Sequence, residues 1–152
     1  QQVKLKFDQL AQVHLSHDGH TVILKGLVDS GNQLYEPFTK RPVMIVALEK
    51  VKSLFPERLL AVFTDVDKIG TLDPEVGKNF HLSIIPYQAV GRKNHFLIGV
   101  RIDYVEIHFW GEIMRTDEVT VACVDQQLSN DGTFDCIIHP KLVEGPKKKR
   151  VS

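Results

Sequence analysis

One carboxylate stands out among the residues of this chain that could do chemistry, and it lies in the turn Asp29-Ser30-Gly31. Leu27 and Val28 predict the end of an apolar strand, and Gly31 allows a tight turn where a side chain would clash. The chain therefore presents an acidic group at the end of a buried strand. Such a group can act on water when a second carboxylate shares its proton, or it can simply bond the amides of its own turn.

Length and composition restrict what the chain can be. Its 152 residues fit one domain, which is large enough to bury a hydrophobic core without disulfide bonds or structural metal ions. Lysine plus arginine and aspartate plus glutamate are equal at 19 each, so no global charge favours nucleic acid as a partner. Cys123 and Cys136 lie in apolar surroundings and are expected to be reduced core thiols. No apolar run reaches the length of a membrane span, and because the chain begins with Gln1 we expect a soluble fragment of a longer protein.

The first half of the chain is expected to place the Asp29 turn at the end of a hairpin. Asp18-Gly19 is a strong hairpin turn, and the strand after it runs into Asp29. Apolar residues at helical spacing predict a helix that Pro56 ends. The expected elements are a hairpin at 13–28, a strand at 43–46, a helix at 47–55 and a loop at 64–79. Residues 59–63 are expected either to extend that helix or to form another short one.

The second half is expected to consist mainly of strands. They are predicted at 80–87, 96–100, 104–109, 118–124 and 135–140, with a polar turn at 91–94, a loop at 110–117 and a helical turn at 141–143. Residues 1–145 are expected to form one domain, and 146–152 a flexible basic tail after Gly145-Pro146. Many short strands with one or two short helices predict a mostly β domain, either a small closed or partly open barrel or a folded sandwich.

Three histidines, His14, His17 and His20, raise the question of a metal site. On a hairpin, His14 and His17 point to opposite faces, and the spacing matches no metal-binding motif. Solvated histidines at a turn are the preferred interpretation, and we expect neither a metal nor another cofactor. A thiol nucleophile working with His139 is disfavoured, because cysteines within apolar strands are usually inert.

The order of elements resembles a retropepsin-like aspartic peptidase subunit, for which Asp-Ser-Gly after an apolar strand is the active-site signature. A hairpin leads into Asp29, and a late apolar strand at 136–138 could pass beside the Asp29 loop. That strand is followed by His139, where retropepsins usually carry glycine. Asn32 also replaces the small residue that commonly follows the catalytic glycine. The resemblance implies a retropepsin-like fold.

A closer resemblance is to the family of sporulation sigma-E factor-processing peptidases. It rests on residues 28–38, Pro42-Val43 and Ile85-Pro86-Tyr87. This family joins an N-terminal membrane-spanning half to a soluble peptidase half, and the resemblance covers nearly all of this chain as the soluble half. It implies removal of the propeptide from an inactive sigma factor in spore-forming bacteria. The full-length protein would then work at the cytoplasmic face of the cell membrane, with a pro-sigma factor as its protein partner.

A single Asp-Ser-Gly per chain implies an active site that two chains share. If Asp29 is catalytic, each chain of a homodimer supplies its own across a two-fold axis. Ser30 would brace the opposing loop, and Gly31 would let the two backbones approach. Asn32 would either donate a hydrogen bond to a carboxylate or merely satisfy the turn. The active-site loop is therefore expected to comprise Asp29, Ser30, Gly31 and Asn32.

A peptidase of this kind also needs a lid that excludes water and holds the substrate. The candidate is the hairpin at 91–94, with Gly91 at its tip and Tyr87 lining the site. An ordinary surface hairpin is an equally good interpretation of that segment. Two other functions compete with the peptidase: an inert module that docks a partner, with Asp29 only capping a turn, and an OB-like nucleic-acid binder. Neutral charge and few aromatic residues on strands argue against the nucleic-acid binder.

Overall fold

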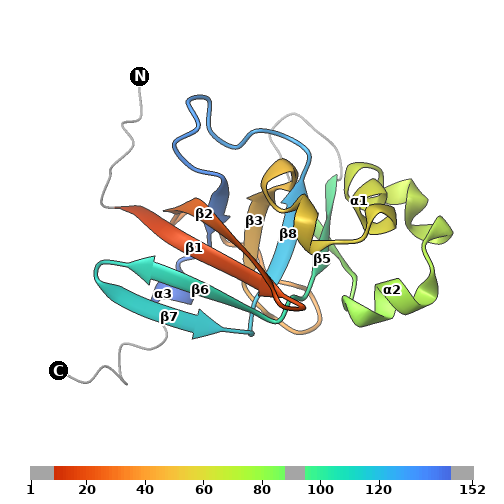
Figure 1. Ribbon diagram of the computed structural model, residues 1–152, viewed down its shortest axis with the longest axis horizontal. Coiled ribbons are helices and arrows are strands. Elements are labelled where there is room, and N and C mark those ends of the chain that lie inside the picture. The colour runs from red at the N-terminus through yellow and green to blue at the C-terminus, as the bar shows by residue number, and fades with distance from the viewer. Residues whose placement is uncertain (1–8, 88–94, 145–152) are drawn as a thin grey trace.

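The computed structural model describes residues 9–87 and 95–144, and β-strands are their main element (Figure 1). The strands are β1 (Leu10–His17), β2 (His20–Val28), β3 (Val43–Ala47), β4 (Ser83–Tyr87), β5 (His95–Val100), β6 (Tyr104–Phe109), β7 (Glu112–Thr116), β8 (Thr120–Val124) and β9 (Cys136–Ile138). They form one sheet in the order β4-β5-β8-β3-β9-β2-β1-β6-β7. The prediction of a mostly β domain is confirmed. Within the described residues the sheet ends at β4 and β7 and stays open, so a closed barrel is not formed.

The hairpin of β1 and β2 confirms the prediction made from Asp18-Gly19. The two strands pair antiparallel from Leu10 with Leu27 to His17 with His20. Asp18 and Gly19 both have positive φ, at 49° and 80°, which is the backbone that a two-residue hairpin turn requires. β2 therefore delivers the chain to Asp29 as predicted.

The helix predicted over 47–55 is wrong in type. The segment forms two 3-10 turns, η2 (Leu48–Lys50) and η3 (Lys52–Leu54), on either side of Val51. Leu48, Val51 and Leu54 are all buried. Their spacing of three fits a 3-10 helix as well as one face of an α-helix, so the apolar pattern alone did not distinguish them.

The described residues contain three α-helices rather than the predicted one or two, namely α1 (Glu57–Thr64), α2 (Pro74–Asn79) and α3 (Lys141–Glu144). α1 and α3 were predicted, but α2 and the 3-10 helix η4 (Val66–Thr71) occupy the predicted loop. Asp65 caps η4 and Asp73 caps α2, each accepting a backbone N–H two residues later. The sequence did contain a signal for the start of α2, namely Asp73-Pro74, since proline favours the first helical position. Figure 1 shows α1 and α2 together at one end of the molecule, beyond β5.

The predicted loop at 110–117 is wrong, because it contains the edge strand β7. Trp110 and Gly111 turn the chain with φ of 56° and 73°, and β7 returns antiparallel to β6. Tryptophan rarely adopts positive φ, so the usual turn signals did not mark this hairpin. The predicted turn at 91–94 and the tail at 146–152 lie outside the described residues.

Two parallel pairings bring distant segments to the Asp29 turn. β9 lies between β2, with which it runs parallel, and β3, with which it runs antiparallel. β3 in turn runs parallel to β8. One core cluster takes buried residues from both halves of this sheet and from α1, among them Val13, Leu24, Met44, Leu59 and Ile107. The centre of the sheet is thus a rigid support for the chain that leaves β2.

Gly26 allows the close approach of β2 and β9, which leads to a prediction about stability. A Cβ at this position would lie 2.6 Å from Ile138 Cδ1 and 2.9 Å from Cys136 Sγ, and both of those residues are fully buried. We expect Gly26→Ala to lower the free energy of unfolding by about 1–3 kcal/mol, because the core must shift to accept a methyl group. Urea denaturation measures this change.

Gly70 provides the matched control for that substitution. A Cβ at Gly70 would meet nothing within 4 Å. Gly70→Ala should leave stability unchanged or raise it, since alanine restricts the unfolded chain. Equal stability of the two variants would contradict the packing argument at Gly26.

Candidate active site

The Asp29 turn is held between β2 and β9. The Asp29 N–H donates to Ile138 O at 3.1 Å, and the Asn32 N–H donates to Asp29 O at 2.9 Å. The late apolar strand therefore passes beside the Asp29 loop, as the sequence predicted. These main-chain bonds fix the place from which the carboxylate projects.

The Asp29 carboxylate is oriented by the turn itself. Its Oδ1 accepts the Gly31 N–H at 2.9 Å. A Cβ at Gly31 would lie 3.2 Å from the same oxygen, so glycine leaves room beside the carboxylate. Asp29 is half-buried and Ser30 is exposed. An aspartate that accepts from the residue two positions later is also an ordinary turn, so this bond fits both a catalytic and a purely structural role.

Asn32 supports the loop from behind. Its side chain is buried, with Nδ2 donating to Val43 O at 2.9 Å and Oδ1 accepting the Leu34 N–H at 3.2 Å. The Asn32 amide thus forms hydrogen bonds with backbone groups of the loop and of β3. Of the two roles open for Asn32, the structure shows the bracing of the turn.

Asp29 helps to line a cavity of about 320 Å³. Its lining consists of Asp29, Gly31, Asn32, Gln33, Leu34, Ile45, Tyr87 and Ile137. The structure therefore brings Tyr87, at the end of β4, to the same cavity as Asp29. Gly91, the other residue proposed for a flap, lies outside the described residues.

Sequence reasoning missed Ile45 and Ile137, which line this cavity from β3 and β9. They are direct partners in the antiparallel pairing of those strands, and both are half-buried. Each lies in an apolar run without alternation, so the sequence did not show which residues face outward. Only the strand order reveals that they flank Asp29.

His139 lies directly after β9, at the position where retropepsins usually carry glycine. Its side chain is buried, its Nδ1 accepts the Lys141 N–H at 3.1 Å, and its ring packs on Tyr35 with centroids 4.6 Å apart. Burial lowers the pKa of His139 below its ordinary value, because a charged ring would lose its hydration. His139 thus packs on Tyr35 directly after β9 and fixes the start of α3.

Comparison with known proteins assigns the family. The model of the family described as sporulation factor SpoIIGA matches residues 1–142. The chain belongs to the sporulation factor SpoIIGA family. It is 36% identical over 151 residues to the sporulation sigma-E factor-processing peptidase of Bacillus subtilis (strain 168), covering 97% of this chain and 49% of that protein. The resemblance to the sporulation sigma-E factor-processing peptidases is confirmed.

Two further relatives carry similar names. The sporulation sigma-E factor-processing peptidase of Priestia megaterium (strain ATCC 12872 / QMB1551) is 33% identical over 91% of this chain and 46% of that protein. The putative sporulation sigma factor-processing peptidase of Bacillus thuringiensis subsp. kurstaki is 33% identical over 95% of this chain and 90% of that protein. The chain spans about half the length of the first two relatives. No solved structure matches it.

The two cysteines of this SpoIIGA family member are packing residues. Cys123 and Cys136 are both buried as free thiols. Burial raises the pKa of each thiol far above its ordinary value, because the thiolate would lose its hydration. A thiol nucleophile is therefore disfavoured here, in agreement with the sequence analysis.

Among residues 9–87 and 95–144, no helix has the length and apolar character needed to cross a membrane.

The three hairpin histidines do not meet. His17 Nδ1 lies 3.4 Å from Asp103, and its ring packs on Phe80. His20 is exposed at the start of β2. His14 lies in the middle of β1 instead of near the turn, and its ring neighbours come from β6. The prediction of solvated turn histidines is therefore wrong for His14, which lies away from the turn, and for His17, whose side chain is only 19% exposed; it is correct for His20.

Proposed function

We propose that this chain is the peptidase unit of an aspartic endopeptidase that removes the propeptide of an inactive sporulation sigma factor. Two chains of a retropepsin-like homodimer would each supply Asp29 to one active site. The observation that carries this proposal is Asp29, whose carboxylate is held by the Gly31 N–H and which lines a cavity, in a chain whose relatives are named processing peptidases. The proposed reaction needs no cofactor.

The chemistry follows from the proximity of two carboxylates. Like charges that share one site cannot both ionise, so one Asp29 would hold a proton while the other accepts one from water. The activated water attacks the peptide carbonyl, and the protonated carboxyl donates to the carbonyl oxygen. A single chain supplies only half of this pair, since Asp-Ser-Gly occurs once.

The Asp29 loop exposes the groups that would contact a second copy of the chain and a peptide substrate. Ser30 is exposed, and within residues 9–87 and 95–144 its hydroxyl has no hydrogen-bond partner. It is therefore available to bond the opposing loop. Leu34, Ile45 and Ile137 give the cavity an apolar wall, which suits an apolar side chain of an extended peptide.

Mixing chains tests whether the active site is shared. Wild-type and Asp29→Asn chains are combined in equal amounts at constant total concentration, and cleavage of a pro-sigma factor is measured. Only pairs with two intact Asp29 residues would work, so activity should fall to about a quarter of the wild-type value. This expectation holds for both weak and tight association once the chains have exchanged partners, which a prolonged incubation of the mixture allows. A fall to about half would show that each chain works alone and would overturn the dimer.

A non-catalytic docking module is the second candidate function. The hydrogen bond from Gly31 to Asp29 supports it, because the same bond caps ordinary turns. That function predicts partner binding without cleavage. A substitution of Asp29 that keeps the turn bond but removes the carboxylate distinguishes the two functions.

A further inference from the structure

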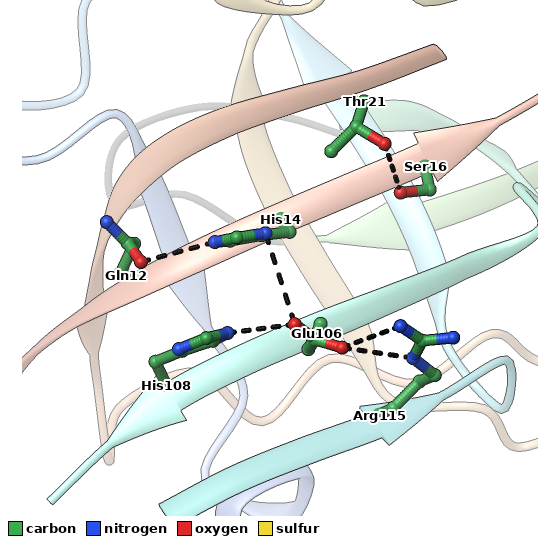
Figure 2. Close-up of polar contacts among 7 residues, drawn as sticks. All are labelled: Gln12, His14, Ser16, Thr21, Glu106, His108 and Arg115. Atoms are coloured by element: carbon green, nitrogen blue, oxygen red, sulfur yellow. Dashed lines mark hydrogen bonds and ion pairs between the residues drawn. The ribbon is translucent and has the colours of Figure 1, made fainter. Parts of the chain in front are cut away.

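The antiparallel pairing of β1 with β6 gathers polar side chains on the face of the sheet that points away from the core. On β1, Val13 and Leu15 are buried, so Gln12 and His14 project to the other side. The register places His14 opposite Glu106. Figure 2 shows the resulting cluster, which consists of Gln12, His14, Glu106, His108 and Arg115. No sequence motif indicated this cluster, because β1 and β6 are far apart in the chain.

Three of these side chains point metal-binding atoms at one another. His108 Nε2 lies 2.9 Å from Glu106 Oε1, and His14 Nδ1 lies 4.0 Å from the same oxygen. One ligand atom from each residue lies within 4.8 Å of the others. Ligands around a tetrahedral zinc ion at about 2.0–2.1 Å are about 3.4 Å apart, so small side-chain rotations would bring these atoms to that distance.

The two imidazole rings are already arranged side by side. Their centroids are 4.6 Å apart and their planes are within 10° of parallel. This arrangement lets both rings present a nitrogen to the same side, and neutral imidazole is the form that binds a metal. The side chains of His14, Glu106 and His108 are 23%, 17% and 31% exposed, so an ion can reach a site that is nevertheless mostly shielded from water.

Neighbouring residues hold the ligands in the orientation that metal binding requires. His14 Nε2 lies 3.2 Å from Gln12 Oε1; in the tautomer with the proton on Nε2, this oxygen accepts a hydrogen bond and Nδ1 keeps its lone pair toward Glu106. Arg115 donates from Nε and Nη2 to Glu106 Oε2, at 3.0 and 2.8 Å. The guanidinium thus binds one carboxylate oxygen and leaves Oε1 for the histidine side. Arg115 is itself held over the Tyr104 ring, 4.0 Å from its centroid.

We propose that His14, Glu106 and His108 form a binding site for one divalent transition-metal ion, with zinc as the expected occupant. Two imidazole nitrogens and one carboxylate oxygen are a donor set that zinc accepts, with water as the fourth ligand. The ion joins β1 to β6 and stabilises this part of the sheet. The site is separate from the Asp29 cavity, and its existence does not depend on the proposed peptidase function.

Titration calorimetry of the metal-free chain with zinc chloride at pH 7.5 tests the site. We expect one zinc per chain, and His14→Ala or His108→Ala should weaken binding at least about tenfold. Excess zinc should also raise the midpoint of thermal unfolding of the wild type, since a bound ion stabilises the folded state. His81→Asn is the control, because His81 is an exposed histidine outside the cluster and asparagine tolerates its positive φ of 49°.

Further variants and a spectroscopic probe separate metal binding from misfolding. Glu106→Gln keeps the side-chain shape and removes the charge, so it should fold and still bind zinc at least about tenfold more weakly. Cobalt(II) in the wild-type site should give the strong visible absorption of four-coordinate cobalt, and this absorption should be absent from the double variant His14→Ala/His108→Ala. Absence of zinc binding by the wild type, or equal affinity in the folded Glu106→Gln chain, would overturn the proposal.

Discussion

Replacing Asp29 by asparagine is expected to lower peptide cleavage by about 10³-fold or more while leaving the fold unchanged. An amide cannot accept the proton of water or donate one as a carboxyl group does, and loss of a directly catalytic group has effects of this size. The introduced amide oxygen would still accept the Gly31 N–H, as Asp29 Oδ1 does at 2.9 Å. The substitution therefore removes the chemistry and keeps the turn.

This property makes Asp29→Asn more informative than Asp29→Ala. Alanine removes both the carboxylate and the turn bond, which contributes about 1 kcal/mol to stability. If Asp29 only caps the turn, asparagine should replace it without loss and alanine should be the damaging substitution. If Asp29 is catalytic, both variants lose activity, and only the alanine variant is also less stable.

Two measurements on the same samples decide the matter. Cleavage of a pro-sigma factor gives the activity, and urea denaturation gives the free energy of unfolding. Ser30→Ala is the matched control on the same loop, since its hydroxyl would brace a second chain without taking part in proton transfer. It should lose much less activity than Asp29→Asn. Near-wild-type cleavage by Asp29→Asn would rule out the aspartic mechanism.

The elements that local chemistry determines were predictable from the sequence. Asp18-Gly19 specified the hairpin because both positions need positive φ, and the apolar strand before Asp29 specified where the carboxylate lies. The same reasoning missed the hairpin at Trp110, where a bulky residue adopts positive φ. It also assigned an α-helix at 47–55, because a spacing of three suits both helix types.

Apart from the strand at 136–138 beside the Asp29 loop, which the family resemblance suggested, features that depend on strand order were not predictable. The cavity beside Asp29 takes Ile45 from β3 and Ile137 from β9, and neither run alternates in a way that marks its outward face. The cluster of His14 with Glu106 requires the register of β1 on β6. Pairing between distant strands is set by how the whole core packs, and a single sequence contains little information about it.

Joining two copies of the chain through a dimeric carrier protein is expected to raise its specific activity by about 10²-fold at micromolar concentration. An active site made from two chains exists only in the associated state, so activity follows association. A short flexible linker gives an effective concentration of about 1 mM, well above the concentration in the assay. In the family, the membrane-spanning half that the sequence resemblance implies would provide the same tethering.

The strand order supports the expectation that untethered chains associate weakly. Retropepsins, which the sequence resembles, strengthen their dimers by interleaving terminal strands. Here β1, the first described strand, is paired on one side with β2 and on the other with β6. β9, the last described strand, lies between β2 and β3. Neither strand has a free edge to offer a second chain, so interleaving of these two strands does not hold the dimer together.

Fusion to a monomeric carrier of similar size is the control, and it should leave specific activity unchanged. The dimeric fusion of Asp29→Asn should stay inactive, which excludes a contaminating peptidase as the source of any gain. Sedimentation of the unfused chain should show mostly monomer at micromolar concentration. If the unfused chain is instead a fully active dimer at nanomolar concentration, tethering adds nothing, and a contact other than interleaved β1 or β9 strands holds the two copies together.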